Sequence, residues 1–329
     1  MGVMLSLIAV LVIVLVPLAG SQVSGLQYVF GVFFPYAGFA VLLAGFVFKV
    51  LNWAKSPVPF RIPTTAGQEF SLPWIKQAKL DNPSTTTGVI GRMAFEILAF
   101  RSLFRNTKAE LRSGNLIYGP AKWLWLGALA FHWAFFIIAV RHLRLFVQPI
   151  PGWVEFLDKI DSIMQIGTPP VYITDVLLIG GVTFLLLRRL LIPRVRYISL
   201  PADYFPLFLI LAIGTTGILM RFFIRTDIVA VKSLLVGLAT FHPFIPKNVG
   251  AIFFIHATLV SVLMAYFPFS KLMHLGGIFL SPTRNLANNN RMVRHVNPWS
   301  YPVKVHTYDE YEDEFRDLMK GAGIPVERE

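Results

Sequence analysis

Residues 119–146 read GPAKWLWLGALAFHWAFFIIAVRHLRLF and indicate the fold class of the whole chain. From Trp123 to Val140 the stretch is apolar apart from His132, and a helix needs about 20 such residues to cross the hydrocarbon of a bilayer. A strand of a membrane barrel would alternate apolar and polar residues instead. The stretch therefore predicts a transmembrane helix that carries two histidines, His132 and His142.

The rest of the chain contains five more apolar runs. The 329 residues are 55% hydrophobic and 15% charged, whereas about a quarter of the residues in a soluble domain are charged. We therefore predict an all-α integral membrane protein, a six-helix transmembrane bundle. The spans are expected at residues 3–20, 28–50, 119–140 (running on to 146), 172–192, 204–224 and 251–280.

The first span has a second interpretation, because an N-terminal apolar run is also typical of a signal peptide. No Lys or Arg precedes the run, and the small residues Ala19, Gly20 and Ser21 make no distinctive cleavage site. We expect the span to be retained as a helix.

The chain contains no cysteine, which restricts the cofactors that it can hold. A disulfide, a covalently attached c-type haem and an iron–sulfur cluster all need cysteine sulfur. Any cluster on an electron path through this chain must belong to a partner. The net charge of +12 is expected to set membrane orientation, and no nucleic acid partner is predicted.

Basic residues are distributed unevenly between the connections. The connections 145–171 and 226–250 contain only Lys159, Lys232 and Lys247 as basic residues. Because Lys- and Arg-rich connections stay on the cytoplasmic side, we expect both termini in the cytoplasm of a prokaryotic inner membrane. The cytoplasmic segments are marked by Lys55, Arg61, Lys76, Lys79, Arg92, Arg101, Arg105, Lys108 and Arg112, and by Arg188, Arg189, Arg194 and Arg196.

Two shorter segments have the spacing of surface helices. In 88–105 apolar residues recur at helical spacing between charges, so this segment is either an interfacial helix or a helix packed on a soluble partner. Within it, Arg92 and Glu96 are expected to form a solvated ion pair. Residues 153–164 predict a second interfacial helix on the outer side, with Trp153 at the headgroup level.

Four histidines lie inside the predicted spans, two in each of two helices. His132 and His142 are separated by about 15 Å along a helix. His256 and His274 are separated by about 27 Å, or five whole turns, which is expected to place both on one face of the helix. The third span runs outward and the sixth inward. Antiparallel packing then pairs His132 with His274 near the cytoplasm and His142 with His256 near the outside. Ionisable residues at membrane depth are costly and indicate function.

Two pairs of imidazoles are what two haem irons need as axial ligands. With both axial positions filled, iron has no open position for oxygen, so one-electron transfer is the predicted chemistry. The lack of cysteine implies haem b, and the mean of the two spacings separates the haems by roughly 20 Å. Arg141, Arg144 and Arg221 near the outer pair are candidate contacts for haem propionates, or they snorkel toward the interface.

A single histidine in an apolar helix is more often a hydrogen-bonded core residue than a ligand. Four histidines in pairs at matched depth favour ligation instead. The remaining three, His242, His295 and His306, fall outside the predicted spans and are expected to be ordinary loop residues.

These motifs resemble the gamma subunit of respiratory nitrate reductase, a membrane cytochrome b. The resemblance covers about residues 122–295 and implies a five-helix core, to which this chain adds an N-terminal helix, with two b haems on four matching histidines. It also implies quinol oxidation near the outer haem and cytoplasmic iron–sulfur partners. The family's quinone-site lysine has no counterpart in register, since Lys159 is offset, so no quinol-contacting residue is assigned. The matching motifs are FHW at 131–133, LLLRRLLIPRVR at 185–196 and PFSKLMH at 268–274.

The N-terminal third resembles a narrower group, the DsrM family, which forms the membrane cytochrome of the sulfite-reduction-associated DsrMKJOP complex. The resemblance implies menaquinone as redox partner and a cytoplasmic heterodisulfide-reductase-like iron–sulfur subunit. It further implies a periplasmic multihaem cytochrome c, a periplasmic iron–sulfur subunit and a second membrane subunit. The motifs that carry it are SPVPFRIPTTAGQ at 56–68, SLPWIKQAKLDNP at 71–83 and FRSLFRN at 100–106.

The expected function is electron transfer between the menaquinone pool and a cytoplasmic iron–sulfur subunit, in a respiratory chain of dissimilatory sulfur metabolism. The chain would be the quinone-reactive subunit of an oxidoreductase, without activity of its own on sulfur compounds. The alternative is a membrane cytochrome of a nitrate reductase or heterodisulfide reductase complex. A haem-free transporter would need helix breaks in related halves, and a plain membrane anchor would not need histidines at membrane depth.

The chain is expected to divide into four regions. They are N-terminal transmembrane helices at 1–51, a cytoplasmic loop with an amphipathic helix at 52–118, the di-haem core at 119–280 and a cytoplasmic tail at 281–329. We expect the iron–sulfur partner to dock on 51–118 and the tail. Phe60, Phe70 and Trp74, spaced among prolines, favour a covered surface, although the acidic end of the tail is equally typical of a solvated segment.

Overall fold

The computed structural model describes residues 2–23, 25–56, 76, 78–105, 108–164, 169–288 and 306–327. The expected docking residues Phe60, Phe70 and Trp74, and His295, lie outside this part of the chain. Within it, five helices are long and apolar enough to cross a membrane. This confirms the all-α membrane class. The five candidate spans are Gly2–Gly20, Leu26–Ala54, Lys122–Leu145, Pro201–Phe223 and Ala251–Phe269.

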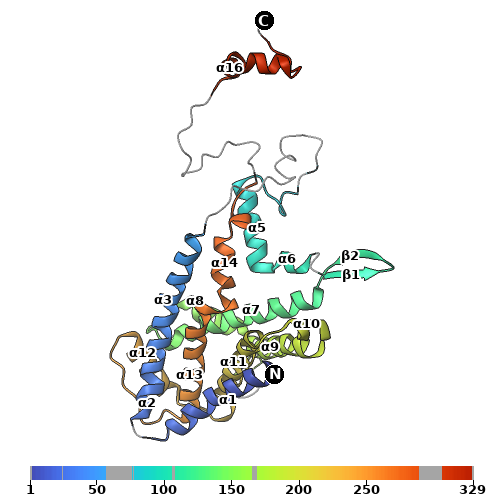
Figure 1. Ribbon diagram of the computed structural model, residues 1–329. Coiled ribbons are helices and arrows are strands. Elements are labelled where there is room, and N and C mark those ends of the chain that lie inside the picture. Colours follow the sequence, from blue (N-terminus) through green and yellow to red (C-terminus); the bar gives the residue numbers. More distant parts are fainter. Residues whose placement is uncertain are drawn as a thin grey trace.

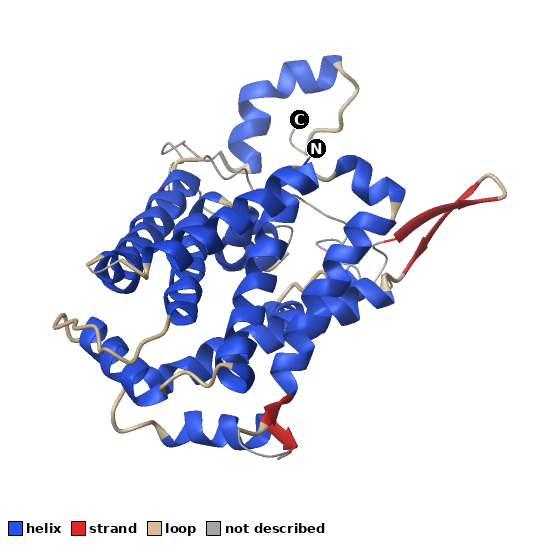
Figure 2. Ribbon diagram, turned by 90° about the horizontal axis from the view of Figure 1, so that it is seen from below, coloured by secondary structure: helices blue, strands red, loops and turns tan. Residues whose placement is uncertain are grey.

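Helices account for most elements, with two small two-stranded sheets (Figures 1 and 2). The first half contains α1 (Gly2–Gly20), α2 (Leu26–Tyr28), the π-helix η1 (Val29–Phe33), α3 (Phe34–Ala54), α5 (Thr86–Ala99), α6 (Arg101–Phe104), β1 (Lys108–Arg112), β2 (Asn115–Gly119), α7 (Lys122–His142), the 3-10 helix η2 (Leu143–Leu145), α8 (Gly152–Asp161) and β3 (Ser162–Met164). The second half contains β4 (Val171–Tyr172), α9 (Ile173–Leu191), α10 (Pro193–Ile198), α11 (Pro201–Ile218), the π-helix η3 (Leu219–Phe223), α12 (Ile228–Ala239), α13 (Ala251–Tyr266), the 3-10 helices η4 (Phe267–Phe269) and η5 (Lys271–Met273), α14 (His274–Leu280), α15 (Pro282–Asn285) and α16 (Tyr308–Gly321).

Helix α9 coincides with the predicted fourth span but is not among the five candidate spans. It has 19 residues, the same length as α1, but Asp175 lies in its first turn and Arg188 and Arg189 lie in its last. It packs against α7 and α11. Its charges are confined to its two ends, where they can reach water or headgroups. Six spans therefore remain the prediction for this chain.

Glycines let α3 approach its neighbour closely. A Cβ on Gly38 would lie 2.6 Å from the backbone oxygen of Ser261, and one on Gly45 would lie 2.6 Å from Pro268. The two glycines are seven residues apart, which is close to two helical turns, so both face the same partner. This contact fixes α3 along α13 and η4, as the element contacts also indicate.

The last predicted span, 251–280, is not one continuous helix. Helix α13 ends at Tyr266, Pro268 lies in η4, and Ser270 adopts an extended conformation and caps η5 with its hydroxyl. Proline cannot donate a helical hydrogen bond and disfavours the continuation of a helix. The expectation that five whole turns place His256 and His274 on one face is therefore wrong, because His274 begins a separate helix.

Both predicted surface helices are shorter than expected. The segment 88–105 divides at Phe100 into α5 and α6, and 153–164 divides into α8 and strand β3. Glu96 does not form a solvated pair: it is 7% exposed, Arg284 lies 3.3 Å from it, and Ser102 donates to it. The Glu96 carboxylate is buried at the junction between α5 and α6, where Ser102 and Arg284 contact it.

The structure also contains elements that the sequence analysis did not predict. β1 and β2 form a hairpin that projects from the helices (Figure 1). Helix α12 lies in the expected outer connection and packs its apolar side into a core with Phe30, Phe253 and Phe254. The acidic part of the tail forms α16, which begins at a capping box of Thr307 and Glu310. The acidic tail segment is therefore helical.

Candidate functional site

The four predicted histidines come together in two pairs. The ring centroids of His132 and His274 lie 5.9 Å apart with the planes at 79°, and those of His142 and His256 lie 6.5 Å apart with the planes at 12°. These are the pairs that antiparallel packing predicted. We call them the inner pair and the outer pair.

Each imidazole is held through its Nδ1 atom. Nδ1 of His132 lies 2.7 Å from the Ala128 carbonyl, that of His142 lies 2.7 Å from the Ile138 carbonyl, and that of His274 lies 2.8 Å from the Lys271 carbonyl. A carbonyl only accepts, so Nδ1 carries the proton in these three rings and Nε2 keeps its lone pair. A metal-binding histidine has this arrangement.

His256 is held by a side chain instead. Its Nδ1 lies 2.9 Å from Oγ1 of Thr216, whose own proton goes to the carbonyls of Ala212 and Ile213 at 2.8 and 3.0 Å. The hydroxyl oxygen is therefore free to accept from Nδ1. Thr216 lies on α11, so a third helix orients this ring.

The distance within each pair suits a metal between the rings. With a metal–nitrogen bond of about 2.0 Å and a ring radius of about 1.1 Å, two imidazoles on opposite sides of one metal have centroids about 6.2 Å apart. The observed values are 5.9 and 6.5 Å. The described residues contain no group of three or more His, Asp or Glu side chains that could hold a metal ion. A macrocycle that supplies its own nitrogens fits two imidazoles; a bare ion does not.

The helices that carry the outer pair are held apart. Helix α7 packs on α8 and α9, whereas α13 packs on α1, α3 and α11, and the described backbones of α7 and α13 make almost no close approach to each other. His142 is exposed and His256 is half-buried. The two rings therefore lie 6.5 Å apart between helices whose described backbones are not in close contact. The arrangement fits haem.

The three arginines predicted near the outer haem gather around one tyrosine. The guanidinium carbons of Arg141 and Arg221 lie 3.6 and 4.1 Å from the ring centroid of Tyr172, and Nη1 of Arg144 lies 3.4 Å from its hydroxyl. We call this group, with its three aspartates, the Tyr172 cluster. The aspartates are Asp158, Asp161 and Asp175.

Each arginine of the cluster already has a protein partner. Arg141 is 6% exposed and lies 2.9 Å from Asp161 and 3.4 Å from Asp175. Arg144 pairs with Asp158 at 2.9 Å, and Arg221 donates to the Pro170 carbonyl at 3.2 Å. The contact with haem propionates therefore stays a prediction. The contacts observed bind the end of α7, next to His142, to α8 and to the π-helix η3.

The remaining described histidines lie outside the helices, as expected. His242 follows α12, with its Nδ1 2.8 Å from the Thr240 carbonyl. His306 precedes α16, with its Nδ1 3.7 Å from Glu314. Neither contacts the two pairs.

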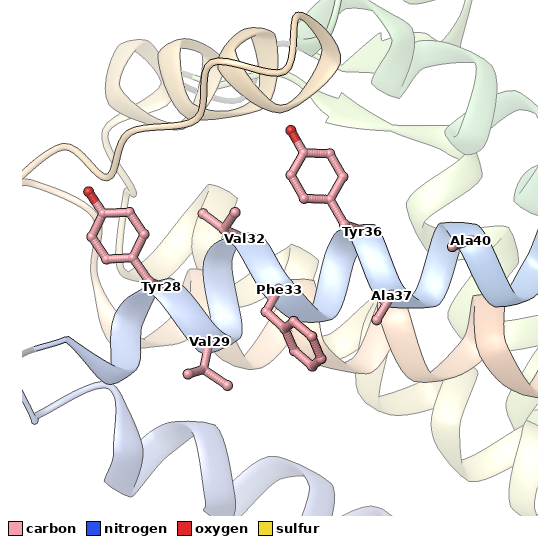
Figure 3. A pocket seen from close by; sticks show the side chains of 7 residues that line it. All are labelled: Tyr28, Val29, Val32, Phe33, Tyr36, Ala37 and Ala40. Carbon is pink, nitrogen blue, oxygen red and sulfur yellow. The ribbon is translucent and has the colours of Figure 1, made fainter.

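A shallow apolar groove of about 620 Å³ lies along α2, η1 and the start of α3 (Figure 3). Tyr28, Val32 and Tyr36 point to one side of the helix and Val29, Phe33 and Ala37 to the other. The Tyr36 hydroxyl donates to the Leu238 carbonyl at 2.9 Å, so one rim is fixed to α12. The four histidines are not among its lining residues, and the groove is therefore separate from the candidate haem site.

The sequence analysis did not identify the residues that support the outer pair, which are Thr216 beside His256 and the aspartates around Arg141. Thr216 is an isolated hydroxyl in an apolar helix, and such a residue gives no sign of its partner until α11 is placed beside α13. Asp161 and Asp175 are charges close to helix ends, which are usually solvated. Asp161 is 5% exposed and accepts from the backbone N–H and the hydroxyl of Thr174.

Comparisons with known proteins agree with this geometry. The family model described as "Nitrate reductase gamma subunit" matches residues 94–296, well over half of the chain and all four histidines. Two relatives are described as "Hdr-like menaquinol oxidoreductase cytochrome b-like subunit". The one from Archaeoglobus fulgidus is 43% identical over 82% of this chain and 83% of the relative, and the one from Archaeoglobus profundus is 39% identical over 80% and 81%. The chain belongs to the nitrate reductase gamma subunit family.

Proposed function

We propose that this chain is a di-haem b membrane cytochrome that transfers electrons between the menaquinone pool and a cytoplasmic iron–sulfur subunit. The observation that carries the proposal is the two imidazole pairs, with ring centroids 5.9 and 6.5 Å apart and all four Nδ1 atoms engaged, which leaves the Nε2 atoms available as ligands. Haem b with two axial imidazoles supplies one-electron transfer and no substrate chemistry at iron. The residues would be His132 and His274 for one haem and His142 and His256 for the other.

The membrane arrangement follows from the same proposal. Positive charge on 51–118 and after α9 supports cytoplasmic termini, which puts the inner pair near the cytoplasm. The four regions of the chain would then be the N-terminal helices to residue 51, the cytoplasmic loop to 118, the di-haem core to 280 and the tail. Electrons would pass between the pairs along α7 and α13.

A quinol site beside the outer pair is the second part of the proposal. The two relatives are named menaquinol oxidoreductase subunits, and this supports menaquinol as the substrate here. The connection between α7 and α9 is lightly charged and would admit a lipid-soluble ligand. A quinone-site inhibitor should shift the spectrum or potential of the outer haem only. A response of the inner haem alone would put the site on the cytoplasmic side.

The most specific part of the proposal concerns the partner subunits and the pathway. The DsrM-like motifs support membership of a complex in dissimilatory sulfur metabolism, with a heterodisulfide-reductase-like iron–sulfur subunit in the cytoplasm. They also support a periplasmic multihaem cytochrome c, a periplasmic iron–sulfur subunit and a second membrane subunit. A nitrate reductase or heterodisulfide reductase complex is the alternative. Mass spectrometry of the affinity-purified complex distinguishes them by which redox subunits are recovered.

The decisive experiment is an absorption spectrum of the purified chain. Reduced-minus-oxidised difference spectra with a haem assay should give a b-type signal and two haems per chain. A transporter or a membrane anchor would give no such signal. Absence of b-type haem in a folded, membrane-inserted preparation would therefore eliminate the proposal.

A further inference from the structure

Phe100 has an unusual backbone and an unusual neighbour. It links α5 to α6 with φ 49° and ψ 44°, the left-handed region that a bulky residue rarely adopts. Its ring centroid lies 5.0 Å from that of His132, with the planes at 88°. A strained residue is kept only where surrounding contacts enforce it, and such residues often mark functional sites.

The first set of enforcing contacts comes from Glu96. This buried carboxylate accepts the backbone N–H of Ser102 at 3.2 Å, and the Ser102 hydroxyl also donates to it. The side chain of one helix thus supplies an acceptor to the first turn of the next, where backbone donors have no partner of their own. Arg284 lies 3.3 Å from the same carboxylate. The chain therefore turns between residues 96 and 102.

The second set comes from α7. The last carbonyls of a helix lack intrahelical donors, and here indoles supply them: Trp125 donates to the Ala99 carbonyl at 2.6 Å and Trp133 to the Leu98 carbonyl at 3.0 Å. Trp133 is the residue next to His132. The end of α5 is therefore docked on α7 at the histidine itself.

The rest of the FRSLFRN motif completes the attachment. The ring of Phe104 lies 5.0 Å from that of Trp125 at 69°, and Arg101 and Arg105 both pair with Asp81. We call Glu96, Phe100 and Ser102 the Phe100 clasp. The cytoplasmic segment is anchored on the membrane helix by these contacts, and Phe100 is the residue that reaches the histidine.

His132 is consequently held on more than one side. Phe131 lies edge-on to it at 4.9 Å, Phe100 lies edge-on at 5.0 Å, and Nδ1 bonds the Ala128 carbonyl. Its plane stands at 79° to that of His274, whereas the outer rings stand at 12° with no other described aromatic ring packed on them. The pair whose imidazole planes are nearly perpendicular is therefore the pair that Phe100 contacts.

We propose that Phe100 is a positioning residue that sets the plane of the His132 imidazole, and hence the axial-ligand geometry of the inner haem. The inference rests on the proposed haem ligation. When the planes of two axial imidazoles are nearly perpendicular, the ligand field at a low-spin ferric haem iron is closer to axial symmetry than when the planes are parallel. A haem held by the inner pair would therefore give the more anisotropic electron paramagnetic resonance signal of the two. A residue that served only to pack the loop would leave that signal unchanged.

The test uses the purified complex with three substitutions at Phe100 and one control. Phe100→Leu keeps apolar volume and removes the aromatic edge, Phe100→Gly removes the ring and relieves the backbone strain, and Phe100→Tyr keeps the ring. Phe104→Ala removes an aromatic ring of the same size that packs on Trp125 and not on His132. The readouts are haem content, the low-temperature resonance spectrum of the oxidised complex and the midpoint potential of each haem.

We expect Phe100→Leu and Phe100→Gly to move the inner signal toward that of the outer haem and to shift only the inner potential. Phe100→Tyr and Phe104→Ala should resemble the wild type. An inner signal that is unchanged in Phe100→Leu, or changed equally by Phe104→Ala, would overturn the inference and leave the haem assignment intact. A wild-type complex without b-type haem would instead overturn the proposed function.

Discussion

The inner and outer pairs contain the same side chains but are supported by different parts of the molecule. The inner pair joins α7 to a short helix, α14, that begins at His274 after a break, and Phe100, at the junction of α5 and α6, packs on His132. The outer pair joins α7 to the middle of α13, and Thr216 of α11 orients His256. Apolar and aromatic contacts dominate the first site, whereas ion pairs of the Tyr172 cluster surround the second.

This difference suits the two proposed partners. The inner ligand is linked by Phe100 to the face where a soluble subunit would dock, so its geometry can depend on that contact. The outer ligand His142 adjoins Arg141, which is fixed by two aspartates inside the protein. Fixed charges near a redox centre bias its potential, since extra negative charge favours the oxidised form. Packing contacts therefore support mainly the inner pair, and buried charges support mainly the outer pair.

The largest expected effect is the selective loss of haem. His132→Ala and His274→Ala should each remove the inner haem, and His142→Ala and His256→Ala should each remove the outer one, because one imidazole cannot replace two. Low-temperature spectra and haem content of the four variants measure this. The exposed loop residue His242 gives a control, since His242→Ala should retain both haems. A crossed pattern would contradict the pairing.

Breaking the buried ion pair of the outer site comes next. Side chains of Arg141 and Asp161 are 7% and 4% exposed, and removal of one partner of such a pair costs about 3–5 kcal/mol. Asp175 still contacts Arg141, so Asp161→Asn should cost about 3 kcal/mol and raise the outer haem potential by removing a negative charge. Thermal unfolding and redox titration of the purified protein report the two effects.

Asp158→Asn is the matched control for that change. Asp158 and its partner Arg144 are 30% and 29% exposed, and pairs this open to solvent contribute at most about 1 kcal/mol. If both variants lower the melting temperature equally, burial does not distinguish the two ion pairs, and the Arg141–Asp161 pair is not the main support of the outer site.

The Thr216 hydroxyl should have a smaller, local effect. Thr216→Val keeps the shape and removes the acceptor for His256 Nδ1, and loss of such a partner lowers metal-site affinity about 10- to 100-fold. Haem retention during dilution in detergent should fall at the outer site only, and Thr216→Ser should restore it. Thr258→Val, which removes a hydroxyl bonded to the Phe254 carbonyl on the same helix as His256, is the control. Equal losses from both valine variants would point to helix packing instead.

The sequence predicted the helices and the histidine pairs better than the contacts around them. Apolar runs and the period of a helix are local properties, so α1, α3, α7, α11 and α13 were found where expected. The break before His274 was missed although Pro268 was visible, because proline occurs in many continuous membrane helices and the apolar pattern runs through it. The predicted pairing of the histidines is nevertheless observed, because it depended on the direction of the helices and the depth of each histidine more than on a common helix face.

Residues that act across distant segments could not be assigned from the sequence alone. Glu96 looked solvated because Arg92 lies one turn away, yet it is buried by contacts with Ser102 and Arg284, the latter far along the chain. The left-handed conformation of Phe100 is equally hidden, because it arises from carbonyls of α5 meeting indoles of α7. Such features become visible only when segments are placed in space.

The smallest predicted effect concerns the exposed ion pairs of Asp81 with Arg101 and Arg105, beside the Phe100 clasp. The hydrogen bond from Arg101, followed by one from Arg105, holds the pKa of Asp81 below its ordinary value of 3.8. A lowered pKa contributes stability that is present above the ordinary carboxyl range and is lost as pH falls through the folded-state pKa. The Asp81 side chain is 50% exposed, so the contribution is under about 1 kcal/mol. Asp81→Asn should therefore raise hydrogen exchange in residues 100–105 slightly at pH 7, and the difference from the wild type should shrink as pH falls below about 4. A difference that grows on acidification would show that Asp81 opposes the closed clasp, and a large change in the outer haem would show that the two sites are not supported separately.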